Sequence, residues 1–212
     1  GETAKICDDG MQYEPENLVY YFYGGLLQFS SNEKELSAET LKKGAALITG
    51  NTNTELASDF YALLGDVYHD LNKDSLSFQA YDSALVYKDD NINALNNYAY
   101  YLSLKKRDLE KAAAMSLKTI KAQPKNTTFL DTYAWVLFEQ GRYAEAATFI
   151  EEALKNMSSD KGNASIYEHA GDIYAKLGKT GEALSMWRKA KSAGGNSKTL
   201  EKKIKFKKYI EN

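Results

Sequence analysis

Apolar and small residues recur along the chain at the spacing of a helix. Tyr61, Gly65 and Tyr68 fall at i, i+4 and i+7, which places them on one stripe of a helical surface. The same arrangement returns at Tyr167–Tyr174, where "YEHAGDIY" matches "YALLGDVY" at both tyrosines and at the Gly-Asp pair. The pattern therefore predicts helices that bury one face and recur within the chain.

The repetition extends over most of the sequence in units of two predicted helices. Each unit has a large residue, a small residue and an aromatic on its first helix, followed by small and aromatic residues on a second helix. Repeats at such a period predict stacked supersecondary units that bury a continuous core. We expect five of them, over residues 18–51, 58–91, 92–126, 127–160 and 164–197.

The glycine in the middle of the repeated helix requires a physical reason. A glycine inside a helix costs about 1 kcal/mol relative to alanine, so Gly65 is expected where another helix approaches closely. We predict Ala84 as its small partner on the second helix, with Tyr81 filling the space around it; the residues around Gly171 repeat this scheme. Asp66 lies about 100° around the helix and is expected to face elsewhere.

Two glycines in "YYFYGGLL" admit two interpretations. They allow a tight crossing against a helix further upstream, which is the interpretation we favour. Alternatively, they open a pocket between Phe22 and Phe29.

These features together resemble the tetratricopeptide repeat, whose signature spaces a large residue, Leu-Gly, Tyr, Ala, an aromatic, Ala and Pro over ~34 residues. The closest matches are "GRYAEAATFIEEAL" at Gly141–Leu154 and "GKTGEALSMWRKA" at Gly178–Ala190. The resemblance implies an all-α fold, a right-handed superhelix (α-solenoid) of antiparallel helix pairs. It also implies that the first helix of each pair lines a concave surface.

Both ends of the sequence carry expectations of their own. Residues 1–17 match the second helix of a truncated upstream repeat, so we expect a fragment of a longer bacterial repeat protein. Residues 198–212 are expected to form a basic capping helix, with six lysines and two glutamates. We interpret these lysines as a solvated face, the alternatives being a tail that docks on another copy or binds an anionic surface.

Composition and charge exclude several classes of function. The net charge of −2 gives no general attraction to nucleic acid, and the longest apolar run is shorter than the ~20 residues of a membrane span. A single cysteine, Cys7, excludes an internal disulfide framework. The compartment stays open: cell envelope or periplasm if an upstream signal was removed, cytoplasm otherwise.

The resemblance, carried over residue by residue, places a set of side chains on the concave groove. The set is rich in carboxylates and large rings, which suit a protein or peptide partner with basic and apolar anchors. The alternative is that Trp135 packs against neighbouring helices and that the acids only solvate the face. The candidate groove residues are Phe22, Phe29, Asp59, Asp66, His69, Asp70, Asn93, Asn96, Tyr100, Asp131, Trp135, Phe138, Glu139, Glu168 and Asp172.

No pattern in the sequence indicates catalysis. It contains no GxSxG, HExxH or Walker motif, and the acids around His69 and His169 are too few for a metal site, so we expect no metal and no cofactor. The sequence thus predicts a non-catalytic protein-binding scaffold. Two alternatives are a targeting or regulatory arm of a longer enzyme and a self-assembling structural repeat module.

Overall fold

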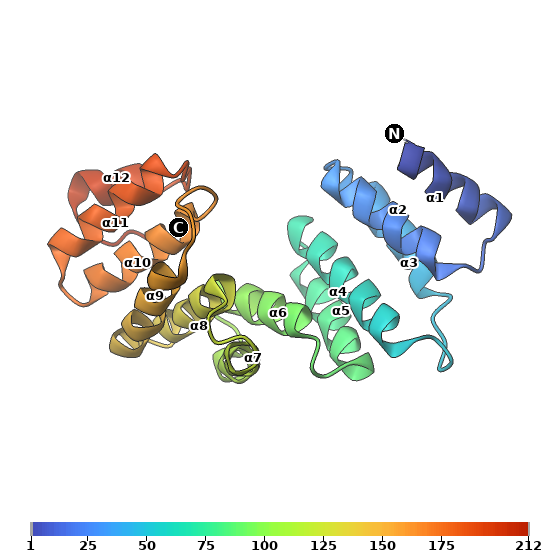
Figure 1. Cartoon of the computed structure of the whole chain (residues 1–212), viewed down its shortest axis with the longest axis horizontal. Coiled ribbons are helices and arrows are strands. Elements are labelled where there is room, and N and C mark those ends of the chain that lie inside the picture. Colours follow the sequence, from blue (N-terminus) through green and yellow to red (C-terminus); the bar gives the residue numbers. More distant parts are fainter. Residues whose placement is uncertain (1, 212) are drawn as a thin grey trace. The chain divides into compact units, whose positions relative to one another are not determined.

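A computed structural model describes residues 2–211 (Figure 1). Within that range the chain forms twelve α-helices and no strand, which confirms the predicted all-α fold class. The helices are α1 Glu2–Tyr13, α2 Leu18–Ser30, α3 Lys34–Ala45, α4 Thr54–Asp70, α5 Asp74–Tyr87, α6 Ile92–Leu104, α7 Leu109–Ala122, α8 Thr127–Glu139, α9 Tyr143–Asn156, α10 Ala164–Lys176, α11 Thr180–Ser192 and α12 Leu200–Phe206.

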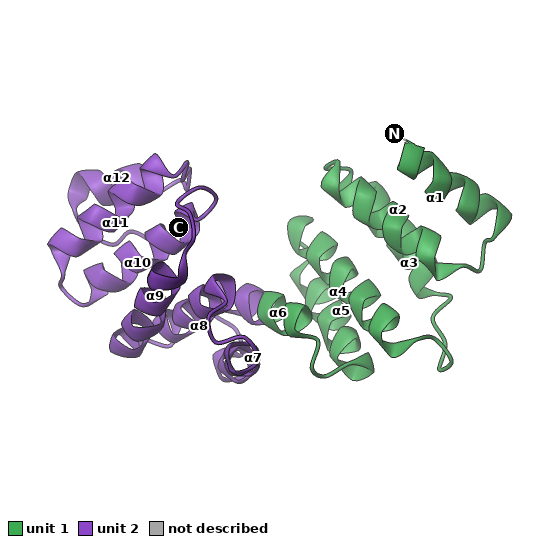
Figure 2. Cartoon of the chain, in the orientation of Figure 1, with its two compact units in different colours: residues 1–98 green, residues 99–212 purple. Residues whose placement is uncertain are grey.

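The chain divides into two compact units, residues 1–98 and 99–212, and the boundary falls within α6 (Figure 2). In unit 1, α2 packs on α3 and α4 packs on α5, with α1 against α2. In unit 2, α8 packs on α9 and α10 on α11, with α12 against α11. Helices adjacent in sequence are therefore also adjacent in space, as in an array of helix pairs.

Short turns join the two helices of each pair, and the residue two positions after each first helix has a left-handed backbone. The N–H three positions after each first helix reaches back to a carbonyl in the last turn of that helix; for example, Lys73 N bonds to Tyr68 O at 2.8 Å. This hydrogen bond pairs a backbone carbonyl that the end of the helix would otherwise leave without a partner. The left-handed residues are Asn32, Asn72, Lys106, Gly141 and Gly178.

The repeated mid-helix glycines allow close approach, but their partner differs from the one predicted. A Cβ on Gly65 would lie 2.8 Å from the Tyr81 ring, and one on Gly171 would lie 2.4 Å from the Trp187 ring. The prediction that Ala84 and its equivalent are the close partners was therefore wrong. A flat aromatic face covers each glycine instead.

The aspartate after each glycine belongs to the same contact. The Tyr81 hydroxyl donates to Asp66, and the Trp187 indole N–H donates to Oδ1 of Asp172 at 2.9 Å. Asp66 and Asp172 therefore do not face away from the helix pair, as the sequence analysis expected. Each aspartate accepts a hydrogen bond from the aromatic residue that packs against the preceding glycine.

The two adjacent glycines of α2 face two different helices. A Cβ on Gly25 would meet Leu41 of α3 at 2.5 Å, so this residue permits the close packing of α2 on α3. A Cβ on Gly24 would stand 3.6 Å from the Cys7 side chain of α1, an ordinary contact distance. The tight crossing therefore lies against α3 and not against the helix upstream.

The C-terminal segment contains less helix than the sequence analysis expected. Helix α12 ends at Phe206, and Lys207 has a left-handed backbone. We call residues 207–211, which follow in non-helical conformation, the C-terminal strap. No helix within residues 2–211 is long and apolar enough to cross a membrane.

Candidate functional site

A row of stacked rings forms the centre of the candidate site in unit 2. The imidazole of His169 on α10 stacks on Trp135 of α8, with ring centres 4.2 Å apart, and Trp135 stacks on Phe138 at 4.5 Å. The ring of Tyr100, near the end of α6, lies 6.3 Å from His169. We call this region the α8–α10 surface. It brings together the predicted residues Tyr100, Asp131, Trp135, Phe138, Glu139, Glu168 and Asp172.

Much of this ring row is interior. Trp135 is only 6% exposed and Phe138 only 4%, because consecutive turns of α8 pack against α10 and the C-terminal strap. Trp135 therefore contributes to packing between α8 and α10. A partner would contact the edges of this row and the side chains around it.

A buried ion pair holds His169 in place. Its Nδ1 lies 2.8 Å from Oδ1 of Asp131, and both side chains are almost fully buried. Burial lowers the pKa of the imidazole, but Asp131, with help from Asp172 and Glu168, outweighs burial and raises the pKa of His169 overall. The sequence gives no local sign of this pair, because Asp131 lies 38 residues from His169 along the chain.

Lys203 of α12 occupies the acidic part of the surface. Its Nζ lies 2.8 Å from Oε1 of Glu168 and 2.7 Å from Oδ2 of Asp172, and the residue is 0% exposed. The interpretation of the C-terminal lysines as a solvated face was therefore wrong for Lys203. Removing one partner from this buried arrangement is costly, because it leaves a buried charge without its partner.

The C-terminal strap adds an aromatic residue and an acid to the same surface. The Tyr209 ring packs edge-on against Phe138, with centres 5.5 Å apart, and Nζ of Lys176 lies 4.4 Å from the centre of the Tyr209 ring. Glu211 pairs with Lys106, which also lies 3.5 Å from Glu139. Unit 2 thus holds three of its own C-terminal side chains in the region predicted to receive a partner.

A cavity of about 280 Å³ lies beside this site. Its lining includes Tyr100, Glu168, His169 and the turn 194–197 that leads to α12. Burial, together with Asp131 and Glu168, raises the pKa of Tyr100 to about 12, so the phenol stays neutral over the physiological range. The cavity is lined by polar groups and is smaller than most sites for drug-sized ligands.

In unit 1, the candidate aspartates of α4 have structural partners. Asp59 accepts a 2.8 Å hydrogen bond from the Asn91 amide, and Asp70 forms a 2.9 Å ion pair with Lys34. Asp59 and Asp70 nevertheless remain exposed, as does Asn93 on α6. The remaining candidates are more enclosed: Phe22, Phe29, Asp66 and His69 are half-buried, and Asn96 is buried.

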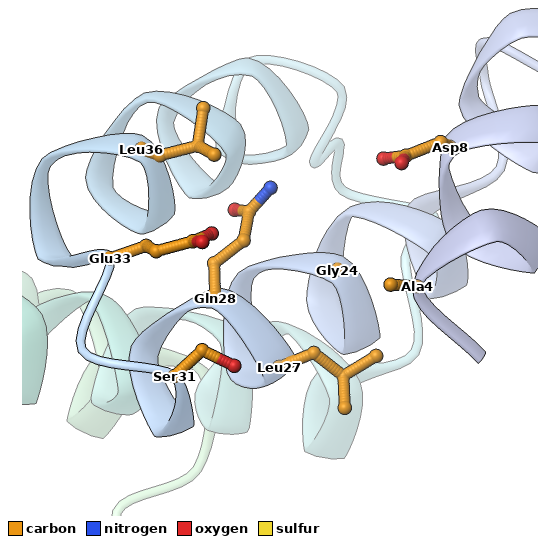
Figure 3. Close-up of a pocket in the computed structure, with 8 residues that line it drawn as sticks. All are labelled: Ala4, Asp8, Gly24, Leu27, Gln28, Ser31, Glu33 and Leu36. Carbon is orange, nitrogen blue, oxygen red and sulfur yellow. The ribbon is translucent and has the colours of Figure 1, made fainter. Parts of the chain in front are cut away.

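Unit 1 also has a cavity that the sequence did not predict (Figure 3). It measures about 250 Å³ and lies among α1, α2 and α3, with Asp8 and Glu33 at its border. The side-chain amide oxygen of Gln28 (Oε1) is buried there and has no hydrogen-bond partner among the described residues. This cavity lies beside Gly24, not between Phe22 and Phe29.

Within residues 2–211, no three His, Cys, Asp or Glu side chains are grouped so that they could hold a metal ion. The charged groups of the α8–α10 surface are instead paired with one another. Its arrangement is suited to holding side chains of another segment by ion pairs and ring contacts.

The architecture defines an α-solenoid built from consecutive helix pairs. Comparison with solved structures specifies the class further: the chain has the fold of tetratricopeptide-repeat proteins. It is similar to YrrB, described as a TPR protein with an unusual peptide-binding site, with a TM-score of 0.67, 19% identity and coverage of 95% of this chain and 99% of that one. It is also similar to a chain of the Cut9–Hcn1 assembly of the APC/C, with a TM-score of 0.81, 13% identity and coverage of 98% and 39%.

Sequence comparison adds a curated relative. Stress-induced-phosphoprotein 1 of Caenorhabditis elegans is 27% identical over 134 residues, which cover 61% of this chain and 39% of that protein. The chain therefore matches less than half the length of this curated relative. No protein-family model matches the chain.

Proposed function

We propose that the chain is a non-catalytic scaffold that binds protein segments carrying basic and apolar anchors. Side chains on the first helices of the pairs would form the binding surface, with α4 contributing in unit 1 and α8 and α10 in unit 2. Solenoids of helix pairs commonly bind partners through such faces.

The single observation that carries this proposal is the way unit 2 holds its own C-terminal residues. Glu168 and Asp172 bind an ammonium group, and Phe138 packs against a tyrosine ring. These are the two kinds of anchor that the sequence analysis assigned to a partner. The peptide-binding site named for YrrB and the assembly named for Cut9 give further support, by analogy of fold.

The acids that a partner's basic residue could reach lie on α4. Asp70 pairs with Lys34 and Asp59 with the Asn91 amide, but both carboxylates remain exposed, whereas Lys203 is fully buried between the two acids of unit 2. Exposed carboxylates attract a basic segment over a distance and select against acidic ones. Affinity would come from side chains held in place before binding, because a preorganised surface loses little conformational entropy.

A selection from random peptides tests this proposal. Displayed 12-residue peptides would be selected on the purified chain, and the affinities of the enriched sequences would be measured by fluorescence anisotropy. We expect enrichment of peptides that combine Lys or Arg with an aromatic residue.

A charge-reversal variant would then locate the site. Asp59→Lys combined with Asp70→Lys should weaken binding by about tenfold or more, because both attractive charges become repulsive. The matched control is Glu35→Lys with Glu39→Lys, which makes the same charge change at exposed positions on α3. Equal weakening in both variants, or enrichment of acidic peptides, would contradict the proposal.

A further inference from the structure

Tyr209 and Glu211 attach the C-terminal strap to the α8–α10 surface through a ring contact and an ion pair. Tyr209 and Ile210 are half-buried, whereas Lys207, Lys208 and Glu211 are exposed. Of these, Tyr209 contacts the ring of Phe138, and Glu211 pairs with Lys106. An aromatic residue and a carboxylate two positions later therefore anchor this non-helical segment, much as a short peptide is anchored by alternate side chains.

The receiving side chains come from three separate places in unit 2. Phe138 belongs to α8, Lys176 to α10 and Lys106 to the turn after α6 (Figure 1). The two lysines supply the cations of this part of the surface, and the carboxylate of Glu139 lies 3.5 Å from Lys106. This region therefore suits a ligand whose aromatic ring lies beside Lys176 and whose carboxylate pairs with Lys106.

The strap is held more weakly than the helix before it. The side chains of Lys106 and Glu211 are 51% and 62% exposed, and ion pairs with this exposure contribute little to stability. Lys203, by contrast, is fully buried between Glu168 and Asp172. The strap can therefore leave the surface while α12 stays in place.

We propose that the C-terminal strap is an internal ligand that competes with a partner for the α8–α10 surface. The partner is an extended segment with an aromatic residue two positions before a carboxylate, the spacing of Tyr209 and Glu211. This inference rests on the proposed function in that it treats the α8–α10 surface as a binding surface. It assigns this surface an aromatic-acidic ligand, while the basic ligand proposed above belongs to α4.

The inference is tested in the full chain with a fluorescent peptide of the strap's own sequence, Lys-Lys-Tyr-Ile-Glu, blocked at both ends. Tyr209→Ala loosens the strap, and thermal melting checks that the fold is retained. If the strap covers the surface in nine of ten molecules, removing its anchor raises the apparent affinity for the peptide about tenfold. The peptide with Tyr replaced by Ala should lose binding to this variant.

A second substitution locates the binding site. In the Tyr209→Ala background, Lys176→Glu should weaken peptide binding by about tenfold, because it replaces the cation over the ring with a repulsive charge. Lys155→Glu on α9 is the matched control and should leave the affinity unchanged, since Lys155 is exposed and remote from the strap's contacts.

Three results would overturn the inference. One is equal affinity of the peptide for the wild-type chain and for Tyr209→Ala. Another is a peptide affinity that Lys176→Glu leaves unchanged in the Tyr209→Ala background. The third is a wild-type dimer, seen by light scattering, that Tyr209→Ala dissociates, because the strap would then bind a second copy. None of these results affects the binding of basic peptides at Asp59 and Asp70, so failure here and failure of the proposed function are distinguishable.

Discussion

At the scale of single residues, the Gly-Asp pair of the repeated helix acts together with one aromatic residue. Gly171 has no side chain, so the Trp187 ring reaches the helix backbone, and the next residue, Asp172, accepts the indole N–H. Gly65, Asp66 and Tyr81 form the same group of three in unit 1. The motif therefore combines close packing with satisfaction of a buried donor.

Substitution of this glycine should destabilise the fold through a steric clash. Gly171→Ala places a methyl group 2.4 Å from a fully buried ring, so we expect a loss of about 1–3 kcal/mol in the free energy of unfolding. The matched control is Gly181→Ala on α11, where no atom lies within 4 Å of the added group. It should gain up to about 1 kcal/mol. Urea unfolding measures both, and a stable Gly171→Ala variant would refute the close approach.

His169 makes the stability of unit 2 dependent on pH. Its pKa is raised in the folded chain, since Asp131 outweighs the opposing effect of burial. The pair with Asp131 therefore stabilises the fold fully below the unfolded pKa of about 6.5, and this contribution is lost as pH rises through the higher folded pKa. The other ionisable groups that act on this cluster include Asp172, Glu168, Lys203, Tyr100 and Glu139.

A comparison of the wild type with His169→Gln tests the sign of this effect. The wild type should be more stable by about 1.5–3 kcal/mol at pH 5.5, as expected for a hydrogen bond to a charged group, and the difference should shrink by pH 9. Urea unfolding at several pH values gives both free energies. A difference that grows with pH, or that stays constant, would contradict the raised pKa.

At the scale of elements, the turns within the helix pairs explain where each first helix ends. One left-handed residue closes each of these turns, and asparagine or glycine occupies four of the five positions. Asparagine tolerates this backbone conformation better than residues with larger side chains do, and glycine adopts it without steric cost. The sequence marks these turns clearly at Gly141 and Gly178, and only weakly at Lys106.

Asn72 tests the role of the turn residue. Asn72→Gly should leave the unfolding free energy within about 0.5 kcal/mol of the wild type, whereas Asn72→Ala should lose about 1 kcal/mol, because alanine is strained at a φ of 56°. Chemical denaturation of the two variants side by side provides the measurement. If Ala and Gly prove equivalent here, the left-handed turn does not limit stability.

The sequence predicted the helices better than their contacts, for physical reasons. Helical period and small residues mark which face of a helix is buried, so the fold class followed from residues such as Tyr61 and Gly65. Side-chain partners depend on distances across the repeat, so the pairing of His169 with Asp131 left no local signal. Lys203 looked like any other lysine in a charged run, and only its position in space shows that it is buried.

At the scale of the whole molecule, the two units use their carboxylates differently. Unit 1 keeps Asp59 and Asp70 exposed on α4, although Asp70 pairs with Lys34, whereas unit 2 buries Glu168 and Asp172 with Lys203. The C-terminal 15 residues carry a net charge of +4 in a chain whose total is −2. Lys203 of this basic segment therefore balances buried acids of unit 2.

The measurement that tests this account most directly is an NMR titration of the isotope-labelled intact chain with the unlabelled strap peptide. We predict that the amide signals of the chain's own Tyr209, Ile210 and Glu211 move towards random-coil positions as the peptide displaces them, while those of Phe138, Glu139 and Lys176 change little because the bound peptide restores the same contacts. Strap signals that already lie at random-coil positions before any peptide is added would contradict the account. So would shifts confined to residues away from the α8–α10 surface.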